Sequence, residues 1–123
     1  MPAASKGSKA ASKGGDPASL DALAEAVESG AGLPAIARAA AKVLDASVAL
    51  IDRSSAVLAV AGASSDQERK LIAGGADVTK VELRVADSIV GELRYRGGSQ
   101  PDPAIGRMVT TLLALELERA RSP

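Results

Sequence analysis

The sequence of 123 residues contains no cysteine and no histidine. Without cysteine there can be no disulfide, no thiolate nucleophile and no cysteine-based zinc or iron–sulfur site. Without histidine the chain also lacks the commonest general base and the commonest metal-ligating ring. Serine, threonine, lysine, tyrosine and carboxylates remain, and their spacing matches no catalytic motif. We therefore expect a protein that is not an enzyme and that holds no metal or cofactor.

Aromatic side chains are almost absent as well, since the chain has one tyrosine, no phenylalanine and no tryptophan. Its hydrophobic fraction is nevertheless 46%, supplied mainly by Ala, Val, Leu and Ile. Small aliphatic side chains bury little area each, at about 25 cal/mol per Å² of apolar surface, so a lone domain of this size should be only modestly stable. A subunit partner would add buried area, and we expect a homodimer.

Neither sign of charge is in excess, because 15 lysines and arginines balance 15 aspartates and glutamates. The folded part is expected to be mildly acidic, because lysines are the only charged side chains in residues 1–15. Direct nucleic-acid binding is therefore not expected, since it needs basic side chains clustered on one face. No apolar run reaches the roughly 18 residues of a membrane span, and the N-terminus lacks the apolar part of a signal peptide. The expected location is the cytoplasm, with no membrane contact.

The composition predicts one domain after a short tail. Residues 1–15 mix Ala, Ser, Gly and Lys, with too little apolar surface to offset the entropy of ordering, and they predict a disordered tail. Residues 16–121 are enough for one core. This domain should open with two helices, the first capped by Asp16 and the second beginning at Leu33-Pro34.

Two β-hairpins are expected after these helices. Residues 47–52 and 56–61 are apolar on both parities, which predicts two central strands, and residues 80–85 and 89–96 alternate between apolar and charged. The charged parity of the second hairpin, which includes Arg84, Arg94 and Arg96, predicts an exposed face of mixed charge.

The register of the second hairpin has two solutions. Pairing Val85 with Ile89 leaves a suitable turn but sets Glu82 opposite Glu92. A shift of two residues would pair Glu82 with Arg94 and force Ile89 into the turn. We favour the first register, because exposed charges contribute little to stability.

Two more helices complete the predicted order. Residues 66–73 form a short helix between the hairpins, with Ser65 as cap and Gly74 as stop. The last helix begins with Asp102 as cap and runs to about Arg119. Its apolar positions span more than one core-facing stripe, so it is either buried on two sides or in contact with another chain.

This order of elements resembles a GAF domain, an α+β fold in which N- and C-terminal helices flank an antiparallel sheet of four or more strands. Residues 30–33, 43–52 (VLDASVALID) and 57–62 (VLAVAG) resemble the N-terminal sensory region of PucR-type purine catabolism regulators. Residues 89–93 (IVGEL) look like the Ile-Gly-x-Leu signature of a late GAF strand, with one extra residue before the glycine. The resemblance covers roughly residues 18–120.

The resemblance implies a regulatory sensory and dimerisation domain of a bacterial transcriptional regulator. In that family a C-terminal helix-turn-helix binds DNA, and nothing of that kind is present in this sequence. DNA is therefore expected as a partner only through a region absent from this fragment. A small-molecule effector is the other partner that such a domain implies. A bilin or haem is not expected, because the chain has no cysteine or histidine to hold one.

The densest polar cluster falls on the short helix, over the position where GAF domains usually cover a ligand. Ser65, Asp66, Arg69 and Lys70 are the candidate ligand-binding residues, for a small anionic or purine-like molecule. The alternative is a solvated helix on which Asp66 and Glu68 pair with Arg69 and Lys70.

Apolar residues of the first and last helices form the candidate dimer interface, as a four-helix contact between two copies. They are Leu20, Leu23, Val27, Leu112, Leu115 and Leu117. The alternative function is a ligand-free structural module similar in outline to roadblock-type domains. Such domains typically join subunits through one helix and one edge strand, so strand pairing across the dimer would favour it.

Overall fold

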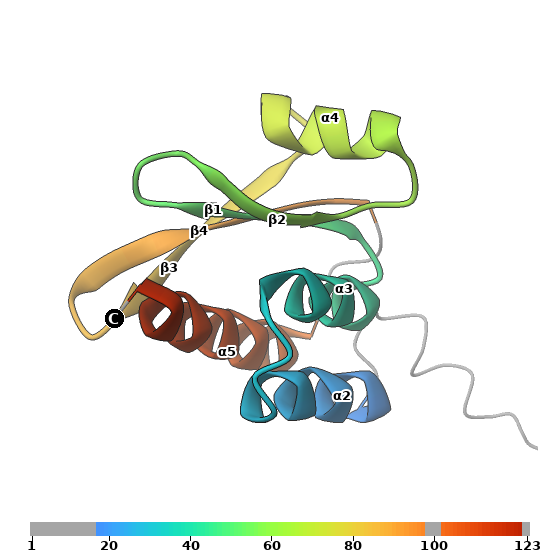
Figure 1. Cartoon of the computed structure of the whole chain (residues 1–123). Coiled ribbons are helices and arrows are strands. Elements are labelled where there is room, and N and C mark those ends of the chain that lie inside the picture. The colour runs from blue at the N-terminus through green and yellow to red at the C-terminus, as the bar shows by residue number, and fades with distance from the viewer. Residues whose placement is uncertain (1–16, 98–101, 122–123) are drawn as a thin grey trace, which may run out of the picture.

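The computed structural model of the protein describes residues 17–97 and 102–121 and has the α+β fold that the sequence predicts. Four helices and one four-stranded antiparallel sheet make up these residues. One side of the sheet is covered by three helices and the other side by one short helix (Figure 1). The predicted tail over residues 1–15 and the predicted cap Asp16 lie outside the described residues. The helices are α2 (Pro17–Glu28), α3 (Leu33–Leu44), α4 (Ser65–Ala73) and α5 (Pro103–Arg121).

The three helices on one side form two layers. α3 and α5 pack directly on the sheet, whereas α2 packs on α3 and α5 and lies farther from the sheet (Figure 1). Gly32 separates α2 from α3 with a φ of 99°, a conformation that favours glycine. Asp102 caps α5 as predicted, since its Oδ1 accepts the Ala104 N–H at 2.8 Å.

The strand order in the sheet is β2-β1-β4-β3, so β1 and β4 are central. The expectation that both strands of the first hairpin are central is therefore wrong for β2. Val57 and Leu58 on this edge strand are 42% and 36% exposed. Ala59 packs on the helical side of β2 and Val60 on the α4 side, so both faces are partly covered. An apolar run in the sequence indicates that both faces of a strand are covered. It does not show whether the strand has a hydrogen-bonded neighbour on each edge. The strands are β1 (Ser47–Asp52), β2 (Val57–Ala61), β3 (Thr79–Val85) and β4 (Ser88–Arg96).

The second hairpin places Glu82 opposite Glu92, as the favoured register predicts. The pairing of Val85 with Ile89 is wrong, because Val85 pairs with Ser88 and the turn is one residue shorter. A β-bulge restores the register. Val90 is the extra residue between the pairs Arg84–Ile89 and Leu83–Gly91, and its side chain is buried in the core.

The like charges of this hairpin are compensated along each strand. Arg84 lies 3.0 Å from Glu82, and Arg94 lies 2.6 Å from Glu92. Each glutamate thus has a cation two residues away on the same face, which offsets the repulsion across the strands.

α5 crosses β4 at Gly91 in close contact. A Cβ atom at this position would lie 2.6 Å from the Ile51 carbonyl oxygen and 2.7 Å from Leu117 Cδ1. Both distances are shorter than any tolerated contact of a methyl group, and one of the two neighbours is backbone. Glycine therefore sets how closely α5 approaches the centre of the sheet.

Gly91→Ala is expected to destabilise the fold by about 1–3 kcal/mol, because the new methyl group must displace α5 or the β1 backbone. Urea unfolding followed by circular dichroism measures this difference. Gly75→Ala is the matched control, since the nearest heavy atom to its Cβ would be Asp77 Oδ1 at an ordinary 3.6 Å. Equal stability of both variants would contradict the described packing.

Candidate functional site

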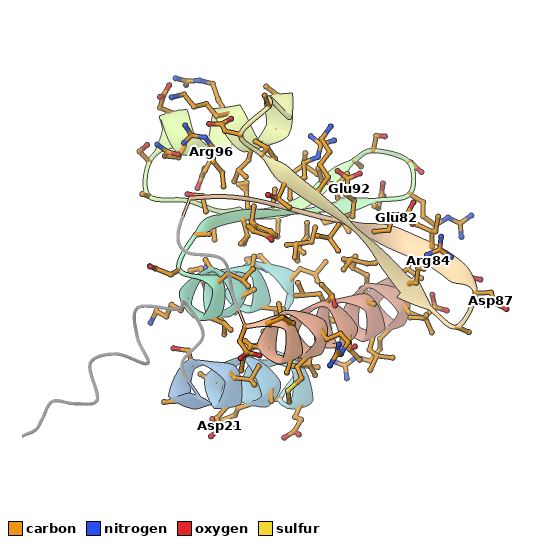
Figure 2. All side chains as sticks on the ribbon, turned by 180° about the vertical axis from the view of Figure 1, so that it is seen from behind. Asp21, Glu82, Arg84, Asp87, Glu92 and Arg96 are labelled. Atoms are coloured by element: carbon orange, nitrogen blue, oxygen red, sulfur yellow. The ribbon has the colours of Figure 1, made fainter. Side chains whose placement is uncertain are left out.

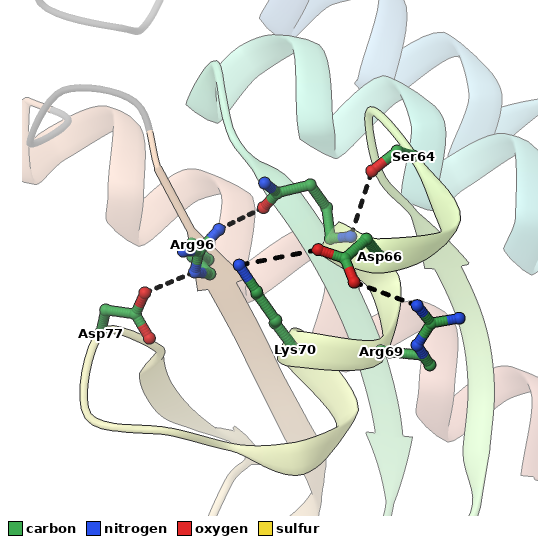
Figure 3. Close-up of polar contacts among 7 residues, drawn as sticks. Ser64, Asp66, Arg69, Lys70, Asp77 and Arg96 are labelled. Carbon is green, nitrogen blue, oxygen red and sulfur yellow. Dashed lines mark hydrogen bonds and ion pairs between the residues drawn. The ribbon is translucent and has the colours of Figure 1, made fainter.

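The polar cluster on α4 is paired within the helix. Asp66 lies 3.0 Å from Arg69 Nη2 and 3.6 Å from Lys70 Nζ, and all three side chains are at least half exposed (Figure 3). Ser64, and not the predicted Ser65, caps the helix, since Ser64 Oγ accepts the Gln67 N–H at 3.2 Å. The structure thus brings together Asp66, Arg69 and Lys70 on the outer, solvated face of the helix.

The buried face of α4 packs directly on the sheet through Leu71. Leu71 is the one buried residue of α4, and it packs in a small cluster with Ala49 of β1 and Val78. Val60 of β2 covers the side of this cluster. Apolar side chains therefore fill the region beneath the C-terminal half of α4.

Arg94 of β4 holds the C-terminal end of α4. Its Nη1 donates to the Ile72 carbonyl oxygen at 2.7 Å and to the Leu71 carbonyl oxygen at 3.3 Å. Its Nε donates to Glu92 at 2.6 Å, and its side chain is 17% exposed. A guanidinium at a helix C-terminus satisfies carbonyls that have no partner within the helix and complements the helix dipole.

Arg96 of β4 holds the other end of α4. Its Nε donates to Asp77 Oδ2 at 2.5 Å, and its Nη1 donates to Gln67 Oε1 on α4 (Figure 3). The hydrogen bond from Arg96 to Asp77 is the main reason why the pKa of the Asp77 carboxyl lies below its ordinary value of 3.8. Arg96 lies beside α4, while Glu92, Glu82 and Arg84 follow along the strands away from it (Figure 2).

The expectation of an exposed face of mixed charge is wrong for Arg94 and Arg96, whose side chains are largely buried. Arg84 fits that expectation, whereas these two arginines anchor α4. The strand alternation shows that all three share a face, and it cannot show that a helix covers part of that face.

The six predicted interface residues divide between core and surface. Leu23 and Leu117 are 0% and 2% exposed and fill the core of their own chain, so their side chains have no surface to offer a partner. Leu20, Val27 and Leu112 are partly buried against that core. Leu115 is 50% exposed, and so is Met108, which the sequence analysis did not include. Met108 and Leu115 lie two turns apart on the same side of α5, with Leu112 between them.

The described residues contain no group of three or more acidic side chains placed to hold a metal ion. Among the same residues, no helix is both long and apolar enough to cross a membrane. The chain matches no protein-family model and no curated protein.

Replacing Arg94 with methionine is expected to speed amide hydrogen exchange in α4 by about tenfold or more, because the helix loses two charge-assisted hydrogen bonds at its C-terminal end. Exchange in β1 should change much less. Arg84→Met is the matched control, since Arg84 has the same glutamate neighbour two residues away but no contact with α4. If both variants exchange alike, Arg94 does not anchor the helix.

The Asp77–Arg96 pair predicts a pH dependence of the α4 region. Because the folded-state pKa of Asp77 is lowered, its stabilising contribution is present above 3.8 and is lost as the pH falls through the lowered value. An NMR titration of the Asp77 carboxyl should show its pKa rising toward 3.8 in Arg96→Gln. The same titration should be unchanged in Arg84→Gln, and an unchanged pKa in Arg96→Gln would contradict the assignment.

Proposed function

We propose that this chain is a regulatory module that self-associates through the outer faces of α2 and α5. The observation that carries the proposal is a second apolar stripe on α5, formed by Met108, Leu112 and Leu115. Met108 and Leu115 are each 50% exposed, and Leu112 between them is partly buried. A helix that packs on its own core needs one stripe only. The second stripe is the surface that a partner would cover.

A groove between α2 and α5 adjoins this stripe. It has a volume of about 380 Å³ and is lined largely by apolar groups, among them Leu20, Ala24 and Met108. An equivalent helix from a second copy would fill such a groove with aliphatic side chains, each worth about 1.5–3 kcal/mol when fully buried. This supports association through helices, in agreement with the small core of the single chain.

The two helices that carry this surface are tied together. Arg119 Nη2 of α5 donates to the Val27 carbonyl oxygen near the end of α2 at 3.1 Å. The same atom lies 2.9 Å from Glu116 Oε1, at ion-pair distance but without hydrogen-bond alignment. The connection fixes α2 against α5, so the proposed surface is held in one arrangement before a partner binds.

The regulatory part of the proposal rests on the sequence resemblance to PucR-type sensory domains. We assign to this chain the role of such a sensory domain, which associates with a second copy while a separate helix-turn-helix region binds DNA. The location that we assign to it is the cytoplasm. Three arginines of the described residues hold helices in place, since Arg94 and Arg96 contact α4, and Arg119 links α5 to α2.

Met108→Glu combined with Leu115→Glu is expected to abolish association, because two carboxylates would face an apolar surface of the partner. Light scattering across a range of concentrations should give twice the chain mass for the parent and the single-chain mass for the variant. Ile72→Glu is the control, since Ile72 is 45% exposed on α4 at the opposite side of the sheet. A parent that stays monomeric, or a variant that stays dimeric, would contradict this function.

A second candidate function is the roadblock-like structural module, and the edge strand β2 favours it. Residues 57–61 contain no charge and no proline, whereas the other edge strand carries Lys80, Glu82 and Arg84. Uncharged edges pair readily with other strands. Leu58→Lys would abolish association if β2 edges pair, and would leave it intact if α2 and α5 form the interface.

A further inference from the structure

A cleft of about 820 Å³ opens at the end of the first hairpin, away from the α2–α5 groove. The C-terminal half of α3 forms one wall and the first turns of α4 form the other, so the cleft spans both sides of the sheet at the end where β1 begins and β2 ends. This volume is within the range of small-molecule sites, about 300–1,000 Å³.

The α3 wall is cationic. Arg38 and Lys42 lie one turn apart on α3 and line the cleft, and neither side chain forms an ion pair or hydrogen bond with any other described residue. Two like charges at this spacing repel each other mildly on a helix. An anionic group placed between them would remove that repulsion. Asp45, the residue that follows α3, is the one carboxylate on this wall.

The α4 wall presents a hydrogen-bond acceptor in a fixed position. Glu68 Oε2 accepts the Gly62 N–H at 3.1 Å, which holds the carboxylate at the rim of the cleft. A Cβ at Gly62 would lie 2.8 Å from Glu68 Cγ, so the glycine is what allows this close approach. The second carboxylate oxygen of Glu68 has no hydrogen-bond partner among the described residues.

The floor between the walls is mixed. Ala46, Val60 and Ala61 supply apolar surface, and Arg96 also lines the cleft. Arg96 uses its Nε and Nη1 to bind Asp77 and Gln67, and as a planar donor it has further N–H groups. The cleft therefore offers cations on one side, an acceptor on the other and apolar surface between them.

We propose that this cleft binds a small organic anion: a carboxylate or phosphate on an apolar body that also carries an N–H donor. The anionic group binds between Arg38 and Lys42, the body covers Val60 and Ala61, and the N–H group donates to Glu68. Such a ligand bridges α3 and α4, and it therefore slows local opening of α4 when it binds. This inference deepens the proposed function, because the ligand would be the effector of the regulatory module. Binding of the ligand to the cleft does not require the α2–α5 interface.

Hippurate is the probe, because it combines a carboxylate, one amide N–H and an aromatic body. N-methylbenzamide is its matched control, since it keeps the amide and the ring and lacks the carboxylate. In an NMR titration of the ¹⁵N-labelled chain, hippurate should shift the amides of residues 41–47, 60–63, 67–68 and 96–97. N-methylbenzamide should bind at least about tenfold more weakly, because it forms no charge-assisted contact with the α3 wall.

Arg38→Ala combined with Lys42→Ala should weaken hippurate binding by about tenfold or more. Both side chains are exposed and alanine favours helix, so the fold is retained, as a dispersed NMR spectrum would verify. Arg53→Ala with Lys80→Ala removes the same charge from exposed sites away from the cleft and should leave binding unchanged.

Absence of hippurate binding, shifts located elsewhere, or equal affinity in both double variants would overturn the proposal. Hydrogen exchange of α4 should slow with saturating hippurate, and faster exchange would contradict the bridging arrangement. The titration is repeated with Met108→Glu/Leu115→Glu, whose association state reports separately on the proposed function. Binding by a monomeric chain would support the site, and association without binding would support the α2–α5 interface alone.

Discussion

The close approach of helices to the sheet is the constraint on which the structure depends. A core without phenylalanine or tryptophan can be filled only if backbones come near each other, because aliphatic side chains span short distances. Gly91 allows Leu117 of α5 to reach the middle of the sheet. Ala37 and Ala40, which are both fully buried, allow α3 to approach the sheet closely. The single chain thus reaches dense packing with a small core, and α2 is left to cover the outside of α3 and α5.

The two sides of the sheet are stabilised by different interactions. On the helical side, burial of apolar area dominates, and Met108 and Leu115 add exposed apolar surface on the outside of α5. On the other side, α4 has one buried leucine and is anchored by Arg94 and Arg96. Directional polar anchoring of a short helix permits local opening at lower free energy than a packed core does. The proposed association surface therefore lies on the more stable side of the sheet, and the proposed ligand site includes the less stable helix α4.

The sequence predicted the elements well, because capping residues and periodicity act locally. Asp102 at the start of α5 and Gly74 at the end of α4 are examples. The pairing of Glu82 with Glu92 is also as predicted, although the predicted turn was one residue too long. The edge position of β2 and the turn at Ser88 were missed, since lateral pairing and a bulge depend on contacts between distant segments.

Two of the predicted interface residues, Leu23 and Leu117, are buried in the core of their own chain for the same physical reason. Periodicity placed Leu23 and Leu117 on apolar faces, but a face cannot show whether it meets its own core or a partner. The role of Arg94 and Arg96 arises only where β4 passes beneath α4. The cleft lies between α3 and α4 at the end of the sheet. Because these helices are distant in the sequence, no local sequence pattern predicts it.

The chain offers a direct test of the α2–α5 interface, because its two methionines are Met1 and Met108 and only Met108 lies among the described residues. A mixed sample of chains labelled with ¹³C-methyl methionine and unlabelled chains would be measured by isotope-filtered NMR. An α2–α5 interface predicts intermolecular nuclear Overhauser effects between the Met108 methyl group and protons of a second copy. A dimer without any such effect at Met108, or a chain that remains monomeric, would contradict it.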